Sequence, residues 1–234
     1  MEDSSREMAR VVGQMFNIPL SLSICSLELA LMALRDVQKF VTATSPPTAG
    51  GSDATEDTNL IHDTFDGLAA FVVPGSDPYS SAQGVVAEEP GAVNAGVTDI
   101  FVTVIDRAVP SAAQGPSSSA AVASLLNQVA QKVSPSATGS FPSFFSRLTF
   151  IEKAAVFQFI EGDQSMLPFR RIGGILAFFV AFLFYSEAST FDFATRKLGG
   201  RPAGWVASNY AGVSDGSCEF LGYFQNRRQA QRNA

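Results

Sequence analysis

The sequence has few charged residues, and this shortage limits the partners it can have. Lysine, arginine, aspartate and glutamate make up 16% of the 234 residues, against roughly a quarter in typical soluble domains. The net charge is −6 and the pI is about 4.8, so the chain offers no positive field for a phosphate backbone. We therefore do not expect nucleic acid as a partner.

Cysteine is scarce as well. Cys25 and Cys218 lie near opposite ends of the chain and form no CxxC pair, which excludes a cysteine-based metal framework. A disulfide between them in an oxidising compartment stays open, although two ordinary thiols are the commoner state of such isolated cysteines. The sequence therefore predicts no metal site.

The chain has one histidine, His62. One histidine cannot form a histidine-based zinc site, and a Ser–His or Cys–His catalytic set would rest on it alone. Asp63 and Asp66 follow it and could orient a base, but a solvated helix start explains these residues more simply. Glu187 and Asp192 suit an interface contact better than acid–base catalysis. We predict no catalytic residue and no cofactor in this chain.

Apolar residues, in contrast, are abundant, and they form two long runs. Hydrophobic residues make up 46% of the chain, and twenty of its residues are phenylalanine. They either pack a core or cover surface that is buried against another protein or a bilayer. The run Met15–Leu34 follows an acidic segment and is interrupted by Pro19 and Glu28, unlike a signal peptide. The run Ile172–Tyr185 is shorter than the roughly 20 residues of a membrane span.

We accordingly predict no transmembrane helix and no export signal of the chain's own. This leaves two locations open: the cytoplasm, or export together with a partner.

The periodicity of the apolar residues predicts an all-α fold, an irregular bundle of about five to seven helices with long loops. Thr149 and Glu152 have the spacing of a capping box at a helix start, and Gly199, Gly200 and Pro202 mark the end of the longest predicted helix. The predicted helices cover residues 19–41, 60–73, 92–109, 120–133, 148–162 and 167–196.

The composition also divides the chain into segments. Residues 42–59 are rich in proline, glycine, serine and acidic residues, which do not pack and therefore indicate a flexible linker. We expect an N-terminal apolar helix within residues 1–43, a linker over 44–59, a main helical domain over 60–216 and a C-terminal tail over 217–234.

Two blocks of turn residues resemble those of a known family. The first, Phe71–Val109, has a helix that ends in a Pro-Gly turn, then a Pro-Gly-Ala step and an Ala-Gly-Val before a further helix. The second, Phe184–Gly216, leads from a helix to a Gly-Gly turn, a Gly-Trp pair that starts at Gly204, and a Tyr-Ala-Gly element. Together these blocks resemble the gluconate 2-dehydrogenase subunit 3 family, the small subunit of a membrane-associated dehydrogenase.

The resemblance implies a subunit without a redox cofactor of its own. Its partner would be a larger flavoprotein of the glucose-methanol-choline oxidoreductase type that holds FAD, with a haem-bearing protein as electron acceptor and membrane association through the complex. The chain departs from the family because it lacks a twin-arginine signal and has an extra N-terminal apolar helix. The alternative function is a membrane-associated helical protein that anchors a complex through its apolar helices.

The resemblance also implies a set of partner-interface candidates. Trp205 and Tyr210 would be rigid aromatic anchors of the kind that dominate interfaces, unless they seal the domain's own core. A third class, a hydrolase or lyase that uses His62, would be active as a monomer. The interface candidates are Pro74, Gly75, Pro90, Gly91, Gly96, Gly199, Gly200, Trp205, Tyr210 and Gly212.

Overall fold

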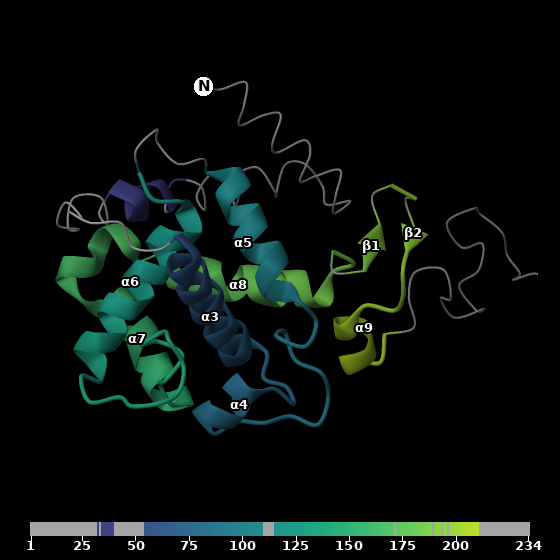
Figure 1. Ribbon diagram of the computed structural model, residues 1–234, viewed down its shortest axis with the longest axis horizontal. Helices are drawn as coiled ribbons and strands as arrows, with labels where there is room; N and C mark the ends of the chain where they lie inside the picture. The colour runs from purple at the N-terminus through teal and green to yellow at the C-terminus, as the bar shows by residue number, and fades with distance from the viewer. Residues whose placement is uncertain are drawn as a thin grey trace, which may run out of the picture.

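The computed structural model confirms an all-α irregular bundle (Figure 1). It describes residues 32, 34–39, 54–109, 115–170, 172–188, 190–192, 194–195 and 197–210, with the backbone alone at 54–57. Strands occur within these residues only as one antiparallel hairpin, which pairs Phe191 with Leu198 and Asp192 with Lys197. The elements are α3 (Ala54–Val72), α4 (Pro78–Gln83), α5 (Val97–Ala108), α6 (Ser118–Val133), α7 (Phe150–Gly162), the 3-10 helix η1 (Gln164–Phe169), α8 (Ile172–Tyr185), β1 (Phe191–Asp192), β2 (Lys197–Leu198) and α9 (Ala203–Ala207).

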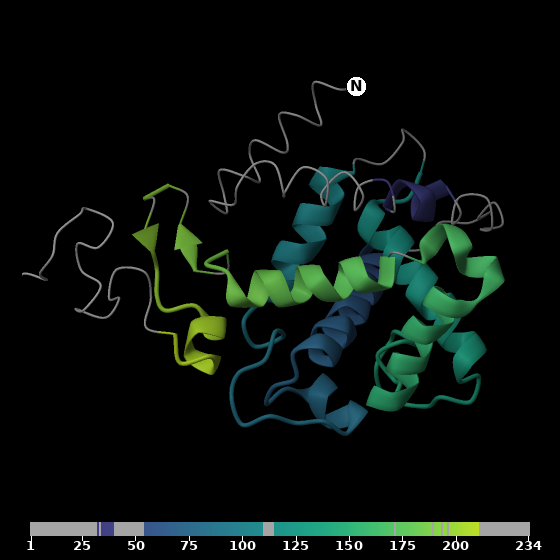
Figure 2. The ribbon, with the colours of Figure 1, turned by 180° about the vertical axis from the view of Figure 1, so that it is seen from behind.

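Helix α3 lies at the centre of the bundle and contacts α4, α5, α6 and α8, while α7 packs on α6 and α8 (Figures 1 and 2). Phenylalanine rings join three of these helices. The ring of Phe101 on α5 meets Phe65 of α3 edge-on at 5.3 Å and stacks on Phe179 of α8 at 6.0 Å. Phenylalanines therefore do fill the core, as one of the two interpretations of their abundance expects.

Helix α3 begins at Ala54 rather than near residue 60, so residues 54–59, which the composition assigned to the linker, are helical. Acidic residues favour the first turn of a helix because they complement its dipole, and Glu56 and Asp57 lie there. The helix ends at Val72, just before Pro74, as predicted. Of the predicted N-terminal helix the structure describes residues 32 and 34–39, which are helical; its other residues lie outside the described part.

Helix α5 is shorter than predicted and begins at Val97 rather than residue 92. The backbone N–H of Ala92 donates to the carbonyl oxygen of Val73 at 3.0 Å, so this segment is tied to the end of α3. Gly96 then has φ +66°, a left-handed conformation that interrupts a helix. Helix α6 begins near its predicted start, where the Ser117 hydroxyl accepts a hydrogen bond from the N–H of Ala120 at 3.1 Å.

The predicted capping box at α7 is confirmed. The N–H of Glu152 donates to the Thr149 hydroxyl at 3.4 Å, and the N–H of Thr149 donates to the Glu152 carboxylate at 2.9 Å. Each side chain thus satisfies a backbone donor that the first helical turn leaves without a partner.

The prediction of one helix over residues 167–196 is correct for α8 but wrong for the rest of the segment, which belongs to η1 and to the β1–β2 hairpin. Pro168 lies inside η1, where it cannot donate a backbone hydrogen bond. After α8 ends at Tyr185, the Asp192 carboxylate accepts hydrogen bonds from the Ala194 N–H and the Thr195 hydroxyl, both at 2.8 Å. This local turn reverses the chain where the periodicity suggested a continuing helix.

The apolar run of α8 is extended by the residues before it. Gln164–Tyr185 forms a helical stretch of 22 residues that is long and apolar enough to cross a membrane by length and composition, and 41% of its most apolar window is buried inside the protein. Residues 172–185 alone are shorter than a membrane span, as expected. Because η1 precedes α8, however, the whole helical stretch reaches the length of a span. The mostly buried core helix of a soluble protein passes the same test.

Candidate functional site

The two Pro-Gly turns of the first sequence block lie against each other inside the protein. A Cβ added to Gly75 would come within 2.1 Å of the Gly91 nitrogen, and one added to Gly91 within 2.6 Å of the Gly75 nitrogen. Their backbone N–H groups donate to Ser80 Oγ and Asn94 Oδ1, each at 3.0 Å. This close approach accounts for glycine at both positions without any partner protein.

The other candidates of the two blocks differ in their surroundings. Pro74 is half-buried, whereas Pro90, Gly96 and Gly200 are exposed. The N–H of Gly199 donates to the carbonyl oxygen of Thr190 at 2.7 Å and so closes the base of the hairpin. Gly212 lies outside the described residues.

Helix α9 packs across the C-terminal end of α8, and Gly204 makes this contact possible. A Cβ at this position would lie 2.5 Å from the Tyr185 Cα and 2.6 Å from the Phe184 carbonyl oxygen. The glycine of the Gly-Trp pair is thus required by the approach of two helices. As a result, Trp205 is held beside the end of α8.

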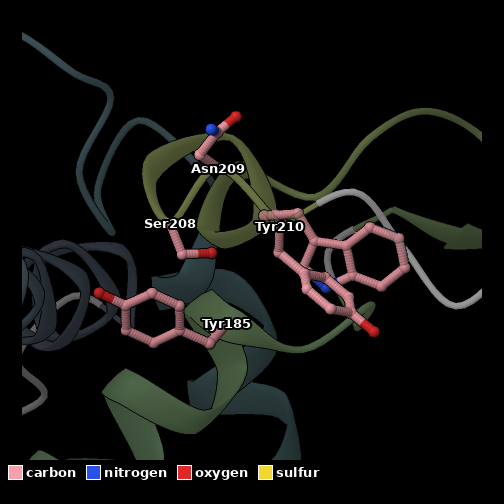
Figure 3. A pocket seen from close by; sticks show the side chains of 5 residues that line it. Tyr185, Ser208, Asn209 and Tyr210 are labelled. Carbon is pink, nitrogen blue, oxygen red and sulfur yellow. The ribbon is translucent and has the colours of Figure 1, made fainter. Parts of the chain in front are cut away.

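An open hollow of about 470 Å³ lies where the two helices meet, and it is lined by Tyr185, Trp205, Ser208, Asn209 and Tyr210. Figure 3 shows that Tyr185 comes from the end of α8, whereas Ser208, Asn209 and Tyr210 come from the turn after α9. The Trp205 and Tyr210 rings meet edge-on at 5.1 Å. Residues of the second sequence block that are about twenty positions apart therefore build one open site with aromatic side chains in its lining.

The hollow continues onto an exposed apolar face of α8. No residue of α8 is charged, yet Phe178 is 60% exposed and Tyr185 is 50% exposed; Tyr210 is 45% exposed. Phe178 and Tyr185 are seven residues apart and thus share one helix face. We call Phe178, Tyr185, Trp205, Val206 and Tyr210 the α8–α9 surface. Phe178 and Tyr185 cannot be singled out from the sequence, because an all-apolar helix gives no sign of which face is exposed.

A second cluster of polar side chains is buried between α3 and the loop before α7. The Asp63 carboxylate accepts hydrogen bonds from the Tyr79 hydroxyl and the Ser143 N–H, both at 2.8 Å. Asn127 accepts from the Ser143 hydroxyl and the Phe145 N–H, both at 2.9 Å. These bonds fix the loop on α3, so the cluster holds the fold together.

Lys153 of α7 is fully buried next to this cluster. Its ammonium donates to the Gly67 carbonyl oxygen at 3.1 Å and to Gln83 Oε1 at 2.9 Å, and it lies 5.6 Å from the centre of the Phe145 ring. Burial lowers the pKa of Lys153 from 10.5 to about 8, and the negative charges of Asp77 and Asp63 oppose this shift. The sequence gives no signal of this lysine, because a lysine beside a glutamate in a helix is ordinarily exposed to solvent.

The carboxylates next to His62 do not assemble around it. Asp63 is bonded to Tyr79, and Asp66 accepts from the Thr98 hydroxyl at 2.6 Å. Burial raises the pKa of Asp66, and the Thr98 bond opposes this rise. His62 Nδ1 instead lies 3.3 Å from Asp99 Oδ1 at the surface, where such a pair contributes little. The arrangement is not that of a base oriented by a buried carboxylate.

Metal ligands do not gather either: the part of the chain that the structure describes has no group of three or more His, Cys, Asp and Glu residues placed to hold an ion. No protein-family model, curated protein or solved structure matches the chain. The α8–α9 surface and the buried polar cluster are thus the two features on which a role can be based. The first is accessible to a partner, and the second is enclosed by the fold.

Proposed function

We propose that this chain is a non-catalytic helical subunit that binds a larger flavin-dependent dehydrogenase of the glucose-methanol-choline type through the α8–α9 surface. The observation that carries the proposal is the exposed face of α8, an uncharged helix with Phe178 and Tyr185 open to solvent. Burying one such aromatic side chain contributes about 1.5–3 kcal/mol. A soluble protein keeps surface of this kind where it meets a partner.

The hollow beside Trp205 supports a protein interface in particular. Aromatic side chains that surround a concavity accept a protruding side chain of a partner, and such pairs provide most of the binding energy at interfaces. The choice of a flavoprotein as partner rests on the resemblance of the two sequence blocks. On that basis the FAD belongs to the partner, and electrons pass from it to a haem-bearing protein.

The first experiment is to recover the tagged chain from its native cells and to record the absorption spectrum of the eluate. We expect a larger protein in stoichiometric amount with flavin bands. The variant Phe178→Ser/Tyr185→Ser should lose this protein. Ile151→Ser is the matched control, because Ile151 is 80% exposed on α7 and lies outside the α8–α9 surface.

A colourless, monodisperse single chain would contradict the proposal. So would a flavoprotein that the double variant retains as well as the wild type does. In the second case the binding would use another surface, and the assignment of the α8–α9 surface would be wrong.

A second candidate function is membrane attachment of a complex through the apolar helices. It is favoured by the length and hydropathy of Gln164–Tyr185. If the chain attaches to a membrane, the purified chain should partition into detergent micelles without any protein partner. If the surface binds protein instead, the purified chain should stay soluble without detergent. The partition measurement therefore separates the two functions.

A further inference from the structure

The described residues that line the hollow carry no charge. They are three aromatic residues with a serine and an asparagine: Tyr185, Trp205, Ser208, Asn209 and Tyr210. The charges in the neighbouring segments are balanced, because Glu187 and Asp192 stand against Lys197 and Arg201, and Lys197 pairs with Asp192 across the hairpin. The hollow therefore suits a ligand without net charge.

The backbone acceptors beside the hollow are already in use. The carbonyl oxygens of Gly204, Trp205 and Val206 accept hydrogen bonds from N–H groups later in the same turn, at 2.8–3.1 Å. The Ser208 hydroxyl donates its proton to the Gly204 carbonyl oxygen at 2.6 Å, and the carbonyl oxygen of Tyr210 accepts from an arginine guanidinium. The turn after α9 is thus fixed by its own hydrogen bonds and offers a ligand few acceptors.

The side chains of the lining, in contrast, have donors to spare. Several donor groups have no hydrogen-bond partner within the described part of the chain: the indole N–H of Trp205, the hydroxyls of Tyr185 and Tyr210, and the side-chain amide of Asn209. An indole N–H can only donate, whereas phenol and amide groups can also accept. A ligand that fits the hollow presents acceptors and has few donors of its own.

A proline-rich segment has this chemistry. Proline has no N–H, and a polyproline II segment makes no internal hydrogen bonds, so its carbonyl oxygens are all open to donors. Its apolar rings pack on aromatic side chains, and aromatic-lined grooves recognise such segments in this way. A sugar fits less well because each of its hydroxyls also has a proton to donate. A helix fits less well because its carbonyl oxygens are bonded within the helix.

The hollow is also held in place before any ligand arrives. In the close-up, Tyr185 and Tyr210 lie on opposite sides of Ser208 (Figure 3), so aromatic rings border the hollow on two sides. The close contact of Gly204 with α8 positions Trp205, and the Trp205 and Tyr210 rings meet edge-on at 5.1 Å. A polyproline II segment is likewise preformed, so little conformational entropy is lost when the two associate.

We infer that the hollow binds an uncharged, proline-rich segment of the partner in the polyproline II conformation. The proline rings pack between the aromatic side chains, and the carbonyl oxygens of the segment accept hydrogen bonds from Asn209 and Tyr210. This inference rests on the proposed function and deepens it, because it names the chemistry of the segment that the partner presents.

Trp205 is the only tryptophan of the chain, so its fluorescence reports directly on the hollow. The probe is a synthetic peptide of L-proline, titrated into the full chain. The matched control is a peptide of D-proline of the same length, which has the same composition but forms a helix of the opposite hand. Maltose and an uncharged amphipathic helical peptide serve as probes for the other two kinds of ligand.

We expect the L-proline peptide to shift the Trp205 emission to the blue and to bind about tenfold more tightly than the D-proline peptide. Asn209→Gly removes the amide and suits the φ of +51° at this position, and Tyr210→Phe removes the hydroxyl but keeps the ring. Each variant should weaken binding about fivefold, as expected for the loss of one hydrogen bond. Ile151→Ser, at an exposed position on α7, should leave binding unchanged.

Equal binding of the two proline peptides, no response of Trp205 to the L-proline peptide, or undiminished binding by either Asn209→Gly or Tyr210→Phe would overturn the inference. So would tighter binding of maltose or of the helical peptide, because the ligand would then be a sugar or a helix. Failure of the proposed function is a separate result. A recovered flavoprotein that the L-proline peptide does not displace contradicts this inference alone, and binding of the peptide without a recovered flavoprotein contradicts only the choice of partner.

Discussion

At the scale of single residues, Lys153 is the clearest case of an ionisable group that the fold removes from water. Its side chain is fully buried, and within the described residues no carboxylate forms an ion pair with it. A neutral amine still has two protons, which are enough for the hydrogen bonds to Gly67 and Gln83. Deprotonation therefore removes the cost of the buried charge and keeps both hydrogen bonds.

This gives a dependence of stability on pH. The pKa of Lys153 is about 8 in the folded protein and 10.5 in the unfolded chain. Between these values the unfolded chain binds more protons, so the free energy of unfolding rises with pH. The contribution of Lys153 should increase by roughly 3 kcal/mol from pH 8 to pH 10.5, and below pH 8 it should be constant. Urea unfolding of the wild type and of Lys153→Met at several pH values measures it as the difference between the two curves.

Taking that difference cancels the other groups that titrate in this range, such as Tyr79, whose pKa is raised by burial and by its bond to Asp63. Parallel curves for the two proteins would mean that the amine titrates near its usual pKa.

At the scale of elements, the sequence predicts helices whose ends are decided by nearby residues. The start of α7 follows from Thr149 and Glu152, which are three residues apart and bond to each other. The end of α3 follows from Pro74. The start of α5 did not follow, because Ala92 bonds to Val73, nineteen positions earlier in the chain, and no local pattern records such a contact.

The candidate site shows the same limit. The turn glycines and Trp205 could be singled out from the sequence because their residue types are unusual. That Gly75 meets Gly91, or that Tyr185 and Tyr210 line one hollow, depends on contacts between separate elements. The exposed face of α8 was missed for a related reason: fourteen apolar residues have no polar stripe that marks the outside.

For α7 the capping box gives a stability prediction. Thr149→Ala removes the hydroxyl that accepts the Glu152 N–H and should lower the free energy of unfolding by about 1 kcal/mol. Thr103→Ala, at an exposed position within α5, should have no such cost. Urea titration followed by circular dichroism measures the free energy of unfolding of both variants. Equal values would mean that the capping box does not stabilise the protein.

For the contact between α8 and α9 the test is Gly204→Ala. The added Cβ would overlap with the Tyr185 Cα and the Phe184 carbonyl oxygen, so α9 must move away from α8. We expect the Trp205 emission to shift to the red while the helix content of the bundle is kept. Gly200→Ala, whose Cβ would have no neighbour within 4 Å, should leave the emission unchanged, and the same shift in both variants would contradict this packing.

At the scale of the whole molecule, the exposed apolar face predicts self-association of the isolated chain. Phe178 and Tyr185 remain in contact with water when no partner is present, and their burial between two copies is favourable. Sedimentation velocity at increasing concentration should show oligomers for the wild type and a monomer for Phe178→Ser/Tyr185→Ser. A wild-type chain that stays monomeric at high concentration would show that this face does not drive association.

The bond between Asp63 and Ser143 joins positions 80 residues apart, and this distance has a consequence for the order in which the protein folds during synthesis. A ribosome adds about 5–20 residues per second. Helix α3 therefore emerges several seconds before the loop whose Ser143 N–H donates to the Asp63 carboxylate. During that interval Asp63 is hydrated, and α3 lacks both α6 and the loop before α7. The central helix of the bundle is thus among the first described elements to be made, yet it reaches its final surroundings only when more than half of the chain has been translated.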